Sequence, residues 1–68
     1  MPGTYKRVEI VGTSPVSFEE AIKAAVAEAS HTIRHTNWFE VVEMRGMIKD
    51  GKPAEYQAIV KIGFKIER

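Results

Sequence analysis

The stretch DGKPAEYQAIVKIGFKIE, residues 50–67, decides the fold because it joins a turn signal to a long alternating pattern. Apolar side chains occupy every even position from 56 to 66, and most of the intervening positions are polar. Such alternation predicts a strand at 54–67 with one face buried. The Asp-Gly pair before it is typical of a tight hairpin turn. We therefore expect residues 37–49 to form the antiparallel partner strand.

Two further elements are predicted N-terminal to this hairpin. Residues 4–12 alternate like a strand, which Gly12 and the following TSP are expected to end. A helix is expected near 17–35, because Ser17 and Glu20 have capping-box spacing and apolar residues then recur at helical intervals. Its inner stripe is rich in alanine, which lets a sheet approach closely. The order predicts an α+β fold, β-α-β-β, in which a three-stranded antiparallel sheet partly wraps around one helix.

Length and composition indicate a single small domain over residues 1–68 that depends on self-association. A chain of 68 residues buries only about 60% of the surface that its unfolded form exposes. Small domains of this kind are usually stabilised by disulfides, a metal or oligomerisation. There is no cysteine, so disulfides and thiolate metal sites are excluded. His31 and His35 would share a helix face, but zinc needs three or four ligands and no third is evident. Oligomerisation is the expected stabiliser, and we expect no metal.

Charge and hydropathy argue against two classes of partner. A net charge of +1 gives no broad electrostatic footprint for nucleic acid. No apolar run approaches the roughly 20 residues that span a bilayer. The N-terminus MPGTYKRVEI lacks the apolar stretch of a signal peptide, so a cytoplasmic location is expected.

The segment NWFEVVEMRG, residues 37–46, alternates only in pieces, and its register identifies the candidate site. A three-residue loop at 50–52 predicts the pairs Lys49–Pro53, Arg45–Gln57, Met44–Ala58 and Val42–Val60. Beyond Val42 that register points Glu40 at the helix, where an unpaired carboxylate is costly. One extra residue near Val41 and Val42, a β-bulge, turns Glu40 outward. Phe39 then lies opposite Ile62, and Trp38 lies outward opposite Gly63.

This register gathers Trp38, Arg45, Gln57 and Lys65 on the face of the sheet away from the helix. A flat ring stacked on Trp38 would have room over Gly63. Gln57 offers an acceptor and two donors to a heteroaromatic edge, and the two cations can meet phosphate or stack. Physical reasoning alone leaves other roles open. Trp38 equally suits packing at an oligomer interface. Gln57 suits a solvated position, Arg45 an intersubunit ion pair, and the strand lysines protection of an exposed sheet edge.

The chain resembles the dodecins, a family of small flavin-binding proteins. The resemblance rests on YKRVEIVGTSPVSFEEAI at 5–22, RHTNWFEVVEMRGMI at 34–48 and DGKPAEYQAIVKIGFKIE at 50–67. It implies a hollow homododecamer that holds stacked flavin pairs between symmetry-related tryptophans. Trp38 matches the stacking tryptophan, Gln57 the glutamine at the polar edge of the isoalloxazine, and Arg45 the arginine of the bacterial type of site. FMN is the expected flavin, riboflavin the second choice, and coenzyme A a second ligand, with Lys6 and Lys65 as the basic residues to test for phosphate contact. Met44 and Met47 depart from the family pattern without touching these residues.

The resemblance implies flavin storage and sequestration rather than catalysis. Stacking of isoalloxazine against electron-rich indoles quenches its excited state and limits photochemical damage. The sequence offers no evident general base, nucleophile or metal cluster. Two rival functions remain as alternatives: a small flavin-dependent reductase, and a single-stranded nucleic-acid-binding module that stacks bases on the sheet. The near-neutral charge argues against the second.

Overall fold

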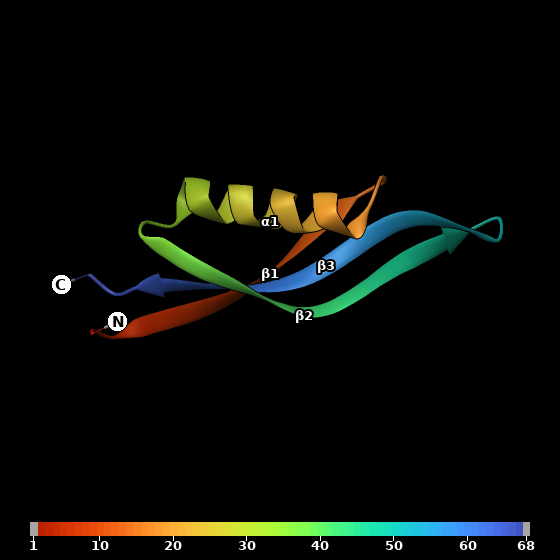
Figure 1. Ribbon diagram of the computed structural model, residues 1–68. Helices are drawn as coiled ribbons and strands as arrows, with labels where there is room; N and C mark the ends of the chain where they lie inside the picture. Colours follow the sequence, from red (N-terminus) through yellow and green to blue (C-terminus); the bar gives the residue numbers. More distant parts are fainter. Residues whose placement is uncertain (1, 68) are drawn as a thin grey trace.

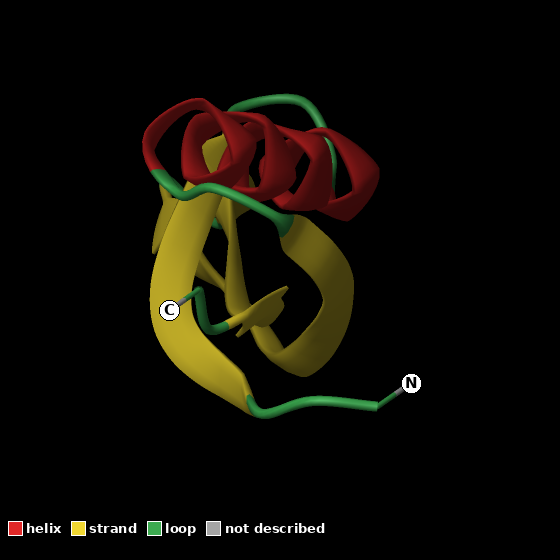
Figure 2. Cartoon of the chain, turned by 90° about the vertical axis from the view of Figure 1, so that its left-hand side faces the viewer, coloured by secondary structure: helices red, strands yellow, loops and turns green. Residues whose placement is uncertain are grey.

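The computed structural model describes residues 2–67 and has the element order β-α-β-β. Strand β1 (Tyr5–Ser14) leads into helix α1 (Phe18–Thr32), which is followed by β2 (Thr36–Lys49) and β3 (Lys52–Lys65). All pairings are antiparallel, and the strand order is β1-β3-β2. The helix lies on one face of a twisted, curved sheet (Figures 1 and 2). The predicted fold class is confirmed.

Strand β1 runs two residues further than expected, and the reason lies in Gly12. This glycine does not end the strand, because it pairs with Ala58 inside the β1–β3 ladder. A Cβ atom at position 12 would lie 2.1 Å from the Ala21 carbonyl oxygen and 2.8 Å from the Ala25 Cβ. Gly12 therefore allows the helix to touch the sheet. The strand ends instead where the Ser14 hydroxyl accepts hydrogen bonds from the Val16 and Ser17 amides, at 2.9 and 3.4 Å.

Helix α1 begins as predicted and ends earlier than predicted. The Ser17 hydroxyl caps it by accepting a hydrogen bond from the Glu20 amide at 3.1 Å. The helix stops at Thr32, and His35 has a left-handed φ of 61°. The expectation that His31 and His35 share a helix face is therefore wrong. Within residues 2–67, no helix is both long and apolar enough to cross a membrane.

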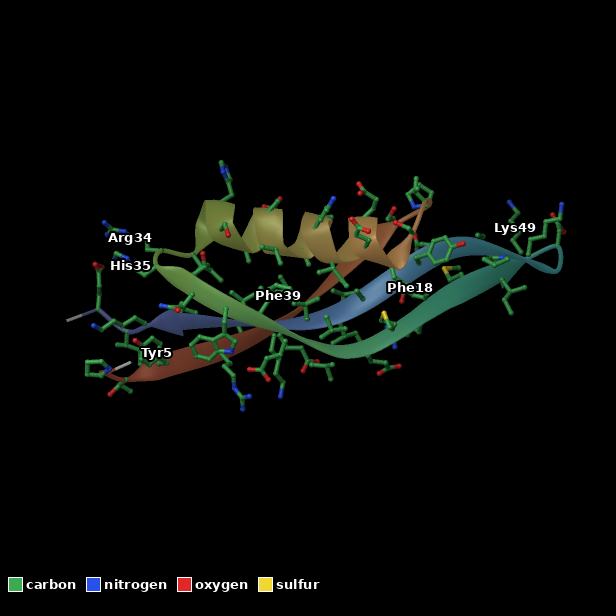
Figure 3. All side chains as sticks on the ribbon, viewed as in Figure 1. Tyr5, Phe18, Arg34, His35, Phe39 and Lys49 are labelled. Atoms are coloured by element: carbon green, nitrogen blue, oxygen red, sulfur yellow. The ribbon has the colours of Figure 1, made fainter. Side chains whose placement is uncertain are left out.

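The core is small because the packed side chains are small. Ala21, Ala25 and Ala29 of the helix pack against Ala58, Val60 and Ile62 of β3. A helix of 15 residues is about 22 Å long, whereas strands of 14 residues reach about 46 Å. The β2–β3 hairpin consequently extends past the helix, with Lys49 at its far tip and Arg34 and His35 at the opposite end of the molecule (Figure 3). Met47 and Ile48 on this extension are 57% and 79% exposed, and Met44, which pairs with Ala58 of the core, is 55% exposed.

The hairpin turn is shorter than predicted. Asp50 and Gly51 form a two-residue loop with φ values of 53° and 75°, the positive angles of a type I′ turn. Lys49 therefore pairs with Lys52 and not with Pro53. A second irregularity between Met47 and Ile48 skips one residue of β3. Since the two differences cancel, Arg45 faces Gln57 and Met44 faces Ala58, as predicted.

The predicted bulge in β2 is present. Val41 pairs with Val60 and Glu43 with Ile59, so Val42 is the extra residue, and its expected pairing with Val60 is wrong. Beyond the bulge, Phe39 faces Ile62 and Trp38 faces Gly63, as expected. A further irregularity at Asn37 ends the regular ladder.

Candidate functional site

Four of the five candidate residues, Trp38, Lys65, Arg45 and Gln57, occupy two separate places on one face of the sheet. Because Ala58, Val60 and Ile62 of β3 face the helix, the odd-numbered residues of β3 and their partners form the opposite face, which we call the outer face. Trp38 lies beside Gly63 near one end of this face, and Arg45 lies beside Gln57 towards the hairpin. Six residues of extended strand between positions 57 and 63 put about 20 Å between the two places. One chain therefore does not bring Trp38 and Gln57 together.

The indole of Trp38 covers Gly63 with its ring face. A Cβ atom built on Gly63 would lie 2.2, 2.3 and 2.5 Å from Cε2, Cζ2 and Cδ2 of the indole. Three ring atoms at nearly equal distances place the plane of the ring, and not an edge, over the glycine. Tyr5 flanks the indole, with ring centroids 5.5 Å apart and planes inclined by 54°. The other face of the indole points away from the sheet.

A carboxylate holds the free edge of this indole. The Trp38 Nε1–H donates a hydrogen bond of 2.9 Å to Glu40 Oε2. The Arg7 guanidinium reaches Glu40 from β1, with its NH1 atom 3.2 Å from both carboxylate oxygens. The pKa of the Glu40 carboxyl is lowered from its ordinary 4.5, first by the hydrogen bond from Trp38 and then by that from Arg7. Glu40 is consequently ionised at neutral pH and remains an acceptor for the indole.

Towards the hairpin, the Gln57 amide is oriented by two neighbours. Arg45 Nε–H donates to Gln57 Oε1 at 2.8 Å, and Gln57 Nε2–H donates to Glu55 Oε1, also at 2.8 Å. Each bond uses half of what the amide offers, so one acceptor lone pair and one N–H donor remain. A ligand edge that carries an N–H beside a carbonyl would complement that remaining pair.

The two lysines named from the sequence lie on different faces. Lys65 pairs with Tyr5 and belongs to the outer face at the Trp38 end. Lys6 pairs with Phe64 and belongs to the helix side of the sheet. Both line an open depression of about 540 Å³ at the end of the strands, together with Arg34, His35 and Glu67. Arg34 NH1 lies 3.8 Å from Glu67 Oε1, so this carboxylate offsets part of the positive charge of the depression.

Sequence reasoning missed the residues that orient the named ones: Tyr5, Arg7, Glu40 and Glu55. Glu40 and Glu55 each lie two positions from a candidate on the same strand and therefore share its face, which is a signal the sequence contains. Arg7 and Tyr5 come from β1, and only the β1–β3 register brings them to Trp38. Among residues 2–67, no three His, Asp or Glu side chains gather into a cluster suited to a metal ion.

Comparison with known proteins gives one consistent result. The family model described as Dodecin matches residues 4–67. The protein named Dodecin from Thermus thermophilus is 49% identical over 67 residues, which are 98% of this chain and 97% of that protein. The structure of dodecin from Streptomyces coelicolor superposes with a TM-score of 0.92 at 46% identity, over 96% of this chain and 93% of that one. The calcium dodecin from Mycobacterium tuberculosis, described as calcium chelating with a novel calcium-binding site, has a TM-score of 0.83 at 28% identity over 96% and 93% of the two chains.

Proposed function

Since this chain belongs to the dodecin family, we propose that it binds and stores a flavin, with FMN preferred over riboflavin. The observation that carries this proposal is the Trp38 indole lying flat on Gly63 with its second face turned outward. A planar, electron-poor isoalloxazine stacks well on such an electron-rich ring. Tyr5 borders the same platform.

The remaining contacts belong to the Gln57 pair. The free acceptor and donor of Gln57 match an isoalloxazine edge, in which N3–H stands between two carbonyl groups. Arg45 fixes the amide orientation through Gln57 Oε1 and adds a positive charge near the ring. Because about 20 Å separates Trp38 from Gln57 in one chain, the proposal requires each flavin to contact Trp38 of one subunit and Gln57 of another.

Self-association into a homododecamer is therefore part of the proposal. Its support within the chain is the limited core, built largely from alanines, and the exposed apolar side chains on the hairpin extension. Exposed apolar residues gathered on one element mark interaction surfaces. A closed particle would cover them and would create the composite flavin contacts in the same step.

We propose storage and photoprotection rather than turnover. Indole stacked on a flavin quenches its excited state, and a ring enclosed between two aromatic faces leaves no exposed face for a second substrate. Coenzyme A is proposed as a second ligand, with the depression near Lys6 and Lys65 as the place to test for phosphate contact.

Titration of FMN fluorescence with purified protein tests the proposal. Quenching at about one flavin per chain is expected, on a particle whose mass by light scattering corresponds to about twelve chains. The Trp38→Ala variant should lose the quenching while the particle persists. Phe39→Leu is the matched control, because Phe39 is the neighbouring aromatic residue on the opposite face of the sheet. Absence of quenching by the unmodified protein would refute flavin storage, and collapse of the Trp38→Ala particle would assign Trp38 to an interface.

A further inference from the structure

The geometry points to Arg7 and Glu40 as positioning residues: together they fix where the Trp38 indole lies within its own plane when it is presented to a stacked ligand. This inference rests on the proposed flavin site and concerns how that site is kept ready. It starts from the torsional freedom of the tryptophan. An indole on an exposed sheet face has two side-chain torsions, and stacking requires both to be held in one geometry.

Three contacts from three directions restrict those torsions. Gly63 of β3 forms the floor, since three ring atoms lie where its Cβ would be. Tyr5 of β1 stands at one side, 5.5 Å away between centroids. Neither contact is directional enough to stop the ring from sliding in its own plane. The hydrogen bond from Trp38 Nε1 to Glu40, at 2.9 Å, supplies that direction.

Glu40 can hold the indole because it is itself held. The Glu40 side chain is 40% exposed, and a free glutamate at such a position would exchange among several rotamers. Arg7 reaches across the central strand and places NH1 3.2 Å from both carboxylate oxygens. Arg7, Gly63 and Trp38 form one cross-strand row, so a residue of β1 acts through Glu40 on a ring of β2.

The charge of Glu40 is also suited to this role. An ionised acceptor makes a shorter and stronger hydrogen bond than a neutral one. The lowered pKa of the Glu40 carboxyl keeps it ionised at neutral and mildly acidic pH. Lys61, which pairs with Glu40 in the ladder, lowers this pKa further. The carboxylate therefore has cationic neighbours on both other strands.

The test combines FMN affinity with a double-mutant cycle. Glu40→Ala should weaken FMN binding about tenfold and Arg7→Ala by a smaller factor, because the indole must be ordered at the moment of binding. In a Trp38→Phe background, which keeps a stacking ring but has no N–H, Glu40→Ala should change the affinity less than twofold. Glu9→Gln is the matched control. Glu9 of β1 pairs with Lys61 as Glu40 of β2 does, and the substitution removes the same negative charge without touching the indole.

Each outcome decides the inference. Equal losses from Glu40→Ala in the unmodified and Trp38→Phe backgrounds would overturn it, because Glu40 would then act without the indole N–H. An unchanged affinity in Glu40→Ala would overturn it as well. The FMN affinity of Glu40→Gln, which keeps an acceptor of the same shape, should fall between those of the unmodified protein and Glu40→Ala. If Glu40→Ala fails to fold, Glu40→Gln replaces it in the double-mutant cycle.

A failure of the proposed function is distinguishable from a failure of this inference. If the unmodified protein binds no FMN, the proposed function fails. The near-ultraviolet circular dichroism of Trp38 in flavin-free protein then decides the role of Glu40. Loss of the signal in Glu40→Ala but not in Glu9→Gln supports the inference, and an unchanged signal overturns it.

Discussion

Replacement of Gly63 by alanine should destabilise the protein when position 38 is tryptophan and should not destabilise it when position 38 is alanine. In the unmodified protein the new methyl group would lie 2.2 Å from the nearest indole atom. The ring would have to withdraw by about 1.2 Å to reach the 3.4 Å of an ordinary contact. Overpacking of this size costs about 1–3 kcal/mol. For a domain of this length, 1 kcal/mol corresponds to about 4–8 °C in Tm, so a fall of at least about 4 °C is expected.

In a Trp38→Ala background the same change meets no ring. Gly63 lies within β3 in an extended conformation that alanine also adopts, and alanine reduces the entropy of the unfolded chain. Gly63→Ala should then be neutral or stabilising by about 0.4–1 kcal/mol. Thermal unfolding of flavin-free protein at one fixed protein concentration gives the four values of this cycle. The Gly63→Ala protein should also lose most FMN affinity, because a ring displaced by about 1.2 Å no longer offers the same stacking plane. Equal effects of Gly63→Ala in both backgrounds would show that the indole does not rest on the glycine.

Three further predictions concern the amide, the helix contact and the helix cap. Gln57→Ala should weaken FMN binding by about 1–3 kcal/mol, since the ligand edge loses its partners; an unchanged Kd in the fluorescence titration would remove Gln57 from the site. Gly12→Ala should lower the free energy of unfolding by about 3 kcal/mol or more, because its Cβ would overlap the Ala21 carbonyl oxygen at 2.1 Å. A folded Gly12→Ala protein with unchanged Tm would contradict the close contact between helix and sheet. Ser17→Ala should lower the free energy of unfolding by about 1 kcal/mol, whereas Ser17→Asp, which keeps an acceptor at the N-cap, should leave it nearly unchanged. Equal Tm values for the two variants would argue against the cap.

The fold follows from the sequence to a large extent because its signals are local. The even-numbered apolar positions of residues 54–67 determine which face of β3 is buried, and the Asp-Gly pair determines the hairpin. The charge of Glu40 requires a bulge, since a carboxylate does not point into an apolar core. The sequence does not determine the features that depend on how backbone segments contact one another. The predicted three-residue loop and the observed two-residue turn with its irregularity near Met47 give the same strand pairing from Met47 onward. The alternating pattern therefore does not distinguish the two turns. The role of Gly12 becomes visible only where the helix meets β1.

The candidate site was predicted residue by residue but not as an arrangement. The alternating pattern, with one bulge, places Trp38, Arg45, Gln57 and Lys65 on the outer face, so their shared face can be predicted from the sequence. It places Lys6 on the other face by the same rule. The separation of Trp38 from Gln57 follows only once their partners on β3 are known. The Arg7–Glu40 pair joins positions 33 residues apart, a contact that no local pattern specifies.

The crystal structure of the FMN complex tests the central claim most directly. We expect isoalloxazine stacked on the face of Trp38 that points away from Gly63, with its polar edge within hydrogen-bond distance of Gln57 from a different subunit. Trp38 Nε1 should still donate to Glu40 in that complex. Flavin bound elsewhere on the particle, or Gln57 of the same chain reaching the ring, would contradict the composite site.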